Sequence, residues 1–174
     1  MKKWKEYYLA DKKRNINSSK DTLLLLYFLR KSQFSKNTIM NKVYGVIYKM
    51  ISKKYLLEIP RSLNVGKGFY IGHMSCITIN SNAHIGNNCN IHKGVTIGQE
   101  NRGTKKGCPT IGNKVWIGIN ATIVGKINIG DDVLIAPNSY VNCDVPSHSI
   151  VFGNPCIIKS RENATESYIN NVID

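Results

Sequence analysis

The stretch IGNKVWIGINATIVGKINIGDDVLI, residues 111–135, decides the fold, because isoleucine returns in it at every sixth position. The same period runs from Ile59 to the polar segment 98–110, with one two-residue slip, and continues past the stretch to Val141. A helix has a period of 3.6 residues and cannot produce this spacing. Repeats of this length are typical of a solenoid in which each unit is a short strand and a corner, and three units close one coil. The thirteen units predict an all-β protein of about four coils, with the aliphatic residues pointing inward.

Two segments lie outside the repeat. Residues 98–110, GQENRGTKKGCPT, are polar and rich in glycine and lysine, so we expect a loop extruded between two coils, either functional or merely tolerated. Residues 1–57 carry helical signals at 21–31 and 41–51, with Asp21 and Asn41 as N-caps. The expected organisation is a basic α-helical N-terminal extension (1–57) that covers the open end of the first coil, a β-solenoid domain (58–158) and a C-terminal tail (159–174).

The basic charge is concentrated in the extension. Residues 1–57 contain 14 Lys and Arg against 3 Asp and Glu, whereas residues 58–174 contain 10 against 8. The larger domain is therefore nearly neutral, and we expect no nucleic-acid partner. The lysines of the extension either form a solvated helix face or, together with Trp4, Tyr7 and Tyr8, contact an anionic membrane.

The sequence also predicts a cytoplasmic protein. The five cysteines are odd in number and include no CxxC pair, which favours a reducing compartment. The N-terminal residues lack the apolar segment of a signal peptide. The longest apolar run, residues 23–29, is far shorter than the roughly 20 residues that span a bilayer. A peripheral contact with the inner face of the membrane through residues 1–57 stays open.

Three motifs carry a resemblance to a known superfamily. EIPRSLNVGKGFYIGH (58–73), HKGVTIG (92–98) and GNPC (153–156), together with the hexapeptide pattern, resemble the left-handed β-helix acyltransferases. Within them the chain is most similar to serine acetyltransferases and to sugar O-acetyltransferases of bacterial polysaccharide clusters, of the colanic-acid type. The resemblance covers residues 45–160. It implies a left-handed parallel β-helix, a homotrimer with active sites between subunits, and transfer of an acetyl group from acetyl-CoA to a hydroxyl.

The resemblance assigns two catalytic residues. His73 matches the general base of the family, and Glu58, fifteen residues earlier, stands where serine acetyltransferases have aspartate. An imidazole that titrates near neutrality suits the removal of a hydroxyl proton. A carboxylate partner would fix its tautomer and favour the imidazolium that forms. The alternative for His73 is a corner histidine that backbone groups satisfy.

Two departures from the serine acetyltransferase pattern bear on the acceptor. Gly72 replaces the aspartate before the catalytic histidine, and Gly107-Cys108 replaces an Arg-His pair before the loop proline. A buried zwitterionic substrate needs such charged partners. We therefore expect a sugar hydroxyl in capsule, exopolysaccharide or O-antigen biosynthesis, with Gly72, Cys108 and Trp116 lining the acceptor pocket. Serine O-acetylation in cysteine biosynthesis is the alternative, and a non-catalytic β-solenoid scaffold is the alternative of another class.

The resemblance further implies a coenzyme A groove in which small residues and backbone amides face the ligand. The matching positions are Gly118, Ile119, Ala136, Gly153 and Pro155.

Trp116 either flanks the thioester or only packs. His92 is expected as a surface or corner residue. No metal site is expected, because the spacings among His73, His84 and His92 are 11 and 8, whereas a zinc site of the γ-carbonic anhydrase kind needs two histidines five residues apart.

Overall fold

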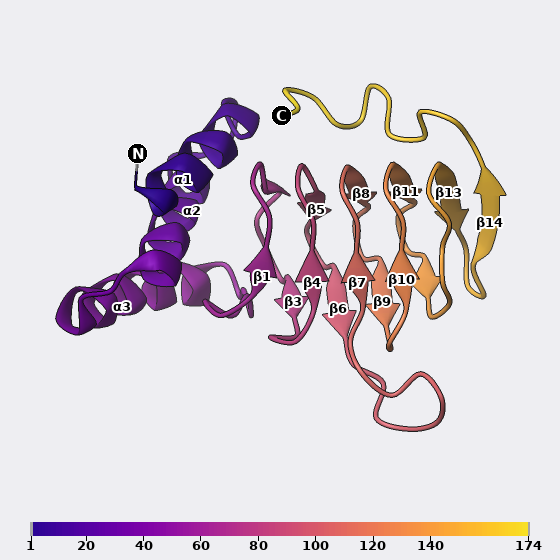
Figure 1. Cartoon of the computed structure of the whole chain (residues 1–174), viewed down its shortest axis with the longest axis horizontal. Coiled ribbons are helices and arrows are strands. Elements are labelled where there is room, and N and C mark those ends of the chain that lie inside the picture. Colours follow the sequence, from indigo (N-terminus) through magenta and orange to yellow (C-terminus); the bar gives the residue numbers. More distant parts are fainter. Residues whose placement is uncertain (1, 174) are drawn as a thin grey trace.

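The computed structural model describes residues 2–173, in which three helices precede a three-sided parallel solenoid (Figure 1). The helices are α1 (Lys3–Arg14), α2 (Lys20–Phe34) and α3 (Thr38–Lys54). They lie at one end of the solenoid, and the coils continue from them in chain order (Figure 1). The helical extension and the solenoid that follows it thus have the order predicted from the repeat pattern.

Each side of the solenoid is a parallel sheet with one strand from each coil. The first face contains β1 (Asn64–Val65), β4 (His84–Ile85), β7 (Thr110–Ile111) and β10 (Asn128–Ile129). The second face contains β2 (Tyr70–Gly72), β5 (Asn90–His92), β8 (Val115–Ile117), β11 (Val133–Ile135) and β13 (Ser149–Phe152), followed by the antiparallel β14 (Ile157–Ser160). The third face contains β3 (Thr78–Ile79), β6 (Thr96–Gly98), β9 (Thr122–Val124) and β12 (Tyr140–Val141).

The hexapeptide aliphatics form the core, as predicted. Ile91 pairs with Ile117 and Ile117 with Ile135, so residues at the same repeat position stack from coil to coil. Ile97, Ile111 and Ile123 are fully buried in the same way. The second face has five parallel strands rather than the four coils expected, because β13 completes a further coil that lacks the isoleucine period. The loop predicted at 98–110 protrudes from the solenoid between β6 and β7 (Figure 1).

The helix starts differ from those predicted. Ser19 caps α2 by accepting a hydrogen bond from the backbone N–H of Thr22, and Asn37 caps α3 by accepting one from Met40. Asp21 and Asn41 were therefore wrongly expected as N-caps, because each lies inside its helix. The carboxylate of Asp21 instead accepts hydrogen bonds from Lys54 Nζ and from the hydroxyl of Tyr55. Helix α1 was not predicted separately.

A buried ion pair fastens the helices to the open end of the solenoid. Arg30 Nε lies 2.7 Å from Asp11 Oδ2, and both side chains are fully buried. Arg30 also donates to the carbonyls of Val65 and Gly66, and Asp11 Oδ1 accepts from the N–H of Phe69. Buried backbone groups need partners, and the first coil has no preceding coil to provide them. The two helices supply these partners through Arg30 and Asp11.

The C-terminal tail folds back along the second face toward the helices (Figure 1). Asp132 holds it at one point by accepting hydrogen bonds from the N–H groups of Ala164 and Thr165. Asn88 holds it at another, because its amide group exchanges two hydrogen bonds with the backbone of Ile173. The tail therefore covers outward-facing side chains of the second face.

Candidate active site

Most of the predicted site residues lie along one edge of the solenoid, between the second and third faces. His73 follows β2, Gly118 follows β8, Ala136 follows β11 and Gly153 follows β13. We call this line, with Ile119 and Pro155 beside it, the site edge. Neighbouring strands of a sheet are about 4.8 Å apart, so the four intervals from the first to the fifth coil span roughly 19 Å. The fold thus brings the proposed base and the proposed coenzyme A positions together along one line.

His73 stands at the mouth of a cavity of about 380 Å³. Its backbone is held at φ 54°, in the left-handed region that corners require, and its imidazole is exposed. The solenoid contributes Tyr70, Met74 and His92 to the lining. The helical extension contributes the opposite wall, which the sequence did not predict, through Asn17, Ser18, Ser19, Thr22 and Tyr55.

A second histidine, His92, lines the same cavity. Its Nδ1 lies 2.8 Å from the carbonyl oxygen of Ile117, which can only accept, so Nδ1 carries the proton and Nε2 is the acceptor. The ring is half-buried, and its centroid lies 4.7 Å from that of Trp116, with the two rings tilted by 48°. Burial lowers the pKa of His92, the carbonyl of Ile117 opposes this, and the nearby His73 lowers the pKa further. A neutral imidazole therefore lies beside the proposed base.

His92 lies at the outward-facing end of β5, a position that agrees with the predicted surface or corner residue, but it is half-buried there. The alternation in Asn90-Ile91-His92 turns Ile91 inward and His92 outward, and the coil register then sets His92 beside Gly72. Both signals were present in the sequence. What the sequence did not show is that the helical extension closes over this position and buries half of the ring.

The ring of His92 leaves no room for a side chain at position 72, which is glycine. A Cβ atom at position 72 would lie 2.4 Å from Cδ2 and 2.7 Å from Nε2 of the His92 ring. Both separations are far shorter than a van der Waals contact. With His92 in place, no side chain fits at position 72, and a carboxylate in particular is excluded.

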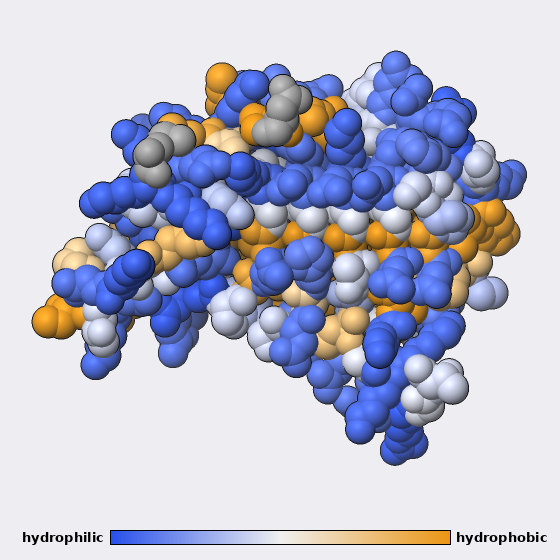
Figure 2. All heavy atoms as spheres, in the orientation of Figure 1, coloured by the Kyte–Doolittle hydropathy of each residue, from blue (hydrophilic) through white to orange (hydrophobic). Residues whose placement is uncertain are grey.

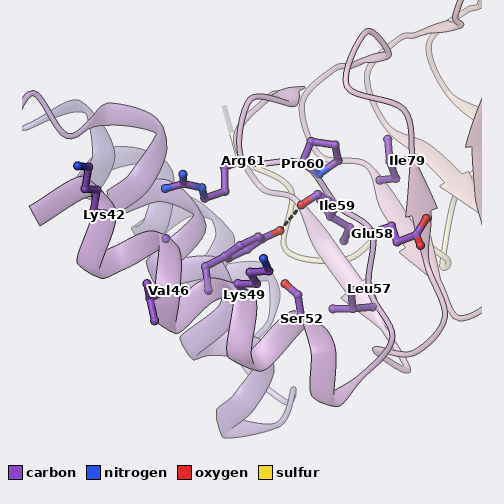
Figure 3. Close-up of a pocket in the computed structure, with 12 residues that line it drawn as sticks. Lys42, Val46, Lys49, Ser52, Leu57, Glu58, Ile59, Pro60, Arg61 and Ile79 are labelled. Carbon is purple, nitrogen blue, oxygen red and sulfur yellow. Dashed lines mark hydrogen bonds between the residues drawn. The ribbon is translucent and has the colours of Figure 1, made fainter. Parts of the chain in front are cut away.

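Glu58 lies near the first coil but not against His73. It forms a bridge with Thr78 on the third face and lines a separate groove of about 780 Å³ between α3 and the first coil. Figure 3 shows its carboxylate pointing away from α3, at the border of that groove. Across residues 2–173 no ion pair within 4.0 Å joins Glu58 to His73. Both side chains are exposed, so their pairing stays a proposal.

Cys108 and Trp116 lie away from the site edge. Cys108 is half-buried in the extruded loop, which leaves the solenoid between the third and first faces, and burial raises the pKa of its thiol. Trp116 faces outward on the second face, where its ring lies between His92 and Tyr168, whose ring centroid is 5.1 Å away. Packing accounts for Trp116 within the chain. Neither side chain lines the His73 cavity of its own chain.

The proposed coenzyme A positions offer little free backbone. The N–H of Gly118 donates to the carbonyl of Ile135, and that of Ala136 to Val151, each at 2.8 Å. A Cβ at position 118 would lie 2.6 Å from the nitrogen of Pro137, so coil stacking already explains this glycine. The expectation that these two amides face a ligand is therefore not met.

Known proteins resemble this chain in sequence. The family model "Bacterial transferase hexapeptide (six repeats)" matches residues 108–143. The putative colanic acid biosynthesis acetyltransferase WcaB of Escherichia coli K12 is 34% identical over 134 residues, which cover 74% of this chain and 82% of the relative. Serine acetyltransferase 2 of Arabidopsis thaliana is 33% identical over 135 residues, which cover 71% of this chain but only 42% of that relative.

Solved structures share the fold. The apoenzyme of soybean serine acetyltransferase superposes with a TM-score of 0.76 at 24% identity, over 90% of this chain and 69% of that one. The serine acetyltransferase of Brucella abortus in complex with coenzyme A gives a TM-score of 0.75 at 21% identity, over 91% of this chain and 68% of that one. The predicted left-handed parallel β-helix is thereby confirmed.

The stacked six-residue units and the extruded loop define a hexapeptide-repeat protein. The relatives that share this pattern are acetyltransferases, and WcaB matches over most of its length. The chain belongs to the hexapeptide-repeat transferase family.

Proposed function

We propose that the protein transfers an acetyl group from acetyl-CoA to a hydroxyl of a saccharide in the biosynthesis of a bacterial surface polysaccharide. The observation that carries the proposal is the position of His73, at a cavity that opens on one end of the site edge. Acetyl-CoA enters the proposal from the family, whose member from Brucella abortus has been crystallised with coenzyme A.

In the proposed reaction His73 removes the proton of the acceptor hydroxyl as the oxygen attacks the thioester carbonyl. The new ester bond forms, the carbon–sulfur bond breaks, and the proton passes to the thiolate of coenzyme A. The coenzyme would lie along Gly118, Ile119, Ala136, Gly153 and Pro155. We keep Glu58 as the proposed partner of His73 on the family resemblance alone, since both side chains are exposed and Glu58 lines a separate groove.

The cavity favours a polyhydroxy acceptor over an amino acid. Its lining includes Asn17, Ser18 and the neutral imidazole of His92, and within residues 2–173 it contains no Asp, Glu, Lys or Arg to pair with a zwitterion. The carboxylate that a serine acetyltransferase has before its base is excluded here by contact of position 72 with the His92 ring. The likeness to WcaB, named for colanic acid biosynthesis, supports the same acceptor class.

Serine O-acetylation is the second candidate, because serine acetyltransferases of plants and bacteria are also relatives. The chain spans 42% and 30% of the two Arabidopsis serine acetyltransferases. Thiol release from acetyl-CoA with L-serine, compared with a panel of free and nucleotide-linked sugars, separates the two candidates. Turnover with L-serine and with no sugar would overturn the saccharide proposal.

His73→Ala tests the assignment of the base. General base catalysis contributes about 10²- to 10⁴-fold, so thiol release should fall by that factor while the fold is kept. His84→Ala is the matched control, because His84 lies on the first face, outside the His73 cavity. Equal activity of His73→Ala and the wild type would refute the assignment, and a chain without any acetyl transfer would favour a scaffold.

The proposal includes a homotrimer with sites between subunits. The extruded loop and the site edge belong to different edges of one chain, so Cys108 would line an acceptor pocket only from a neighbouring subunit. Sedimentation velocity tests the trimer, and a monomer at assay concentration with full activity would count against it.

The proposal also includes a cytoplasmic location with a peripheral contact to the inner face of the membrane through residues 1–57. Of the helices within residues 2–173, none combines the length and hydropathy that a membrane crossing requires. The basic extension supports a surface contact, since it carries most of the net positive charge of the chain.

A further inference from the structure

The aromatic residues of α1 pack against α2. The ring of Trp4 lies 5.7 Å from that of Tyr27, and Tyr8 packs edge-on against the same ring at 5.2 Å. Tyr7 contacts Phe34 at 5.0 Å. These rings hold α1 against α2 and are half-buried, so they leave only part of their surface for the membrane contact expected of Trp4, Tyr7 and Tyr8.

Helix α3 instead exposes an unpartnered apolar face. Ile39 is 74% exposed, Val46 is 60% exposed and Met50 is 67% exposed, with Val43 between them at 44%. Their spacings of four, three and four residues set all four on one side of the helix. We call them the α3 stripe. In Figure 2 apolar atoms lie at the surface where Figure 1 shows the outer end of α3, and hydrophilic residues surround them.

The border of the stripe is positively charged. Lys42, Lys49 and Lys53 are exposed and fall along one side of it, and α3 contains no acidic residue. None of the three pairs with an acid within residues 2–173, whereas Lys54 is held by Asp21. An apolar stripe bordered by lysines is the pattern of a helix that lies in the headgroup region of an anionic membrane.

We propose that the α3 stripe docks on an anionic phospholipid surface, with Lys42, Lys49 and Lys53 facing the lipid phosphates. The inference rests on the peripheral contact proposed above and narrows it to one helix face. A two-fold contact with a second copy of the chain fits this face less well, because two stripes in contact would bring two sets of lysines together without acids. An anionic bilayer complements both the apolar stripe and its charges.

Co-sedimentation with vesicles tests the proposal on the full chain. The wild type should bind vesicles of phosphatidylglycerol and phosphatidylethanolamine and leave pure phosphatidylcholine vesicles unbound. Ile39→Asp/Met50→Asp should lower the partition coefficient at least tenfold, since it puts charge into the buried face of the docked helix. Lys42→Gln/Lys49→Gln/Lys53→Gln should lower it about a hundredfold, since each lysine near an anionic surface contributes about fivefold.

Matched control variants show whether a loss of vesicle binding comes from the α3 stripe itself or from any change in the charge or hydropathy of the chain. Lys5→Gln/Lys12→Gln/Lys13→Gln removes the same charge from exposed positions of α1, and Ile157→Asp changes an exposed apolar residue of β14. Both should bind as the wild type does. The proposal fails if the wild type binds no vesicles, if the α1 variant loses binding as much as the α3 variant, or if Ile39→Asp/Met50→Asp changes only the oligomeric state. Thiol release in the same samples reports acetyl transfer independently.

Discussion

Gly72→Asp tests whether the site excludes an acidic side chain at the position before the proposed base, His73. The new Cβ would lie 2.4 Å from the His92 ring, so the imidazole must leave its place. It would lose the 2.8 Å hydrogen bond to Ile117 and the tilted aromatic contact with Trp116. Each of these losses costs about 0.5–1.5 kcal/mol, and overpacking costs a further 1–3 kcal/mol. We expect Gly72→Asp to lower the free energy of unfolding by about 2–6 kcal/mol and to abolish acetyl transfer.

Urea unfolding followed by circular dichroism measures the change in stability, and thiol release with L-serine and sugars measures activity. Gly72→Asp/His92→Ala should recover much of the loss, because the double variant removes the ring that the new side chain meets. Gly98→Ala is the control, since its Cβ would meet only Val124 at 3.3 Å. A stable Gly72→Asp protein that gains serine acetylation would refute both the steric argument and the acceptor assignment.

Three further predictions concern the fold around the site. Arg30→Met leaves Asp11 buried without its partner and should cost about 3–5 kcal/mol in urea unfolding, with partial recovery in Arg30→Met/Asp11→Leu. Because burial lowers the pKa of His92, protonation opposes the folded state, so stability should fall as the pH drops below 6.5 and level off below the folded pKa; His92→Phe should flatten this slope between pH 5 and 7. Asp132→Ala should speed hydrogen exchange at Ala164 and Thr165 while the coils keep their protection.

The solenoid could be predicted from the sequence because its core is a one-dimensional pattern. An isoleucine every six residues meets the same position in the next coil, as in the pairing of Ile117 with Ile135, so local spacing determines the long-range contact. The last coil was not predicted, because the isoleucine period does not continue to β13. The site edge followed from the same periodicity, since residues after each strand of the second face must stack.

The helical extension could not be predicted to the same depth. Nothing in the local sequence marks Arg30 as fully buried, because its partner Asp11 and its carbonyl partners are distant in the chain. The wrong N-caps have a local cause, since Ser19 and Asn37 precede the apolar stretches by more residues than the pattern suggested. The wall that the α1–α2 connection forms over His73 is a tertiary feature with no sequence period behind it.

The extension therefore has three roles that a deletion cannot separate. It covers the first coil through Leu25 and Arg30, it closes the His73 cavity through Ser18, and it carries the α3 stripe on its outer face. A chain without residues 1–57 would expose the carbonyls of Val65 and Gly66 and open the cavity, so it would lose stability and acetyl transfer together. Surface substitutions on α3 leave the buried contacts intact. We expect them to change membrane binding alone, and a parallel loss of acetyl transfer in vesicle-free solution would show that α3 also shapes the site.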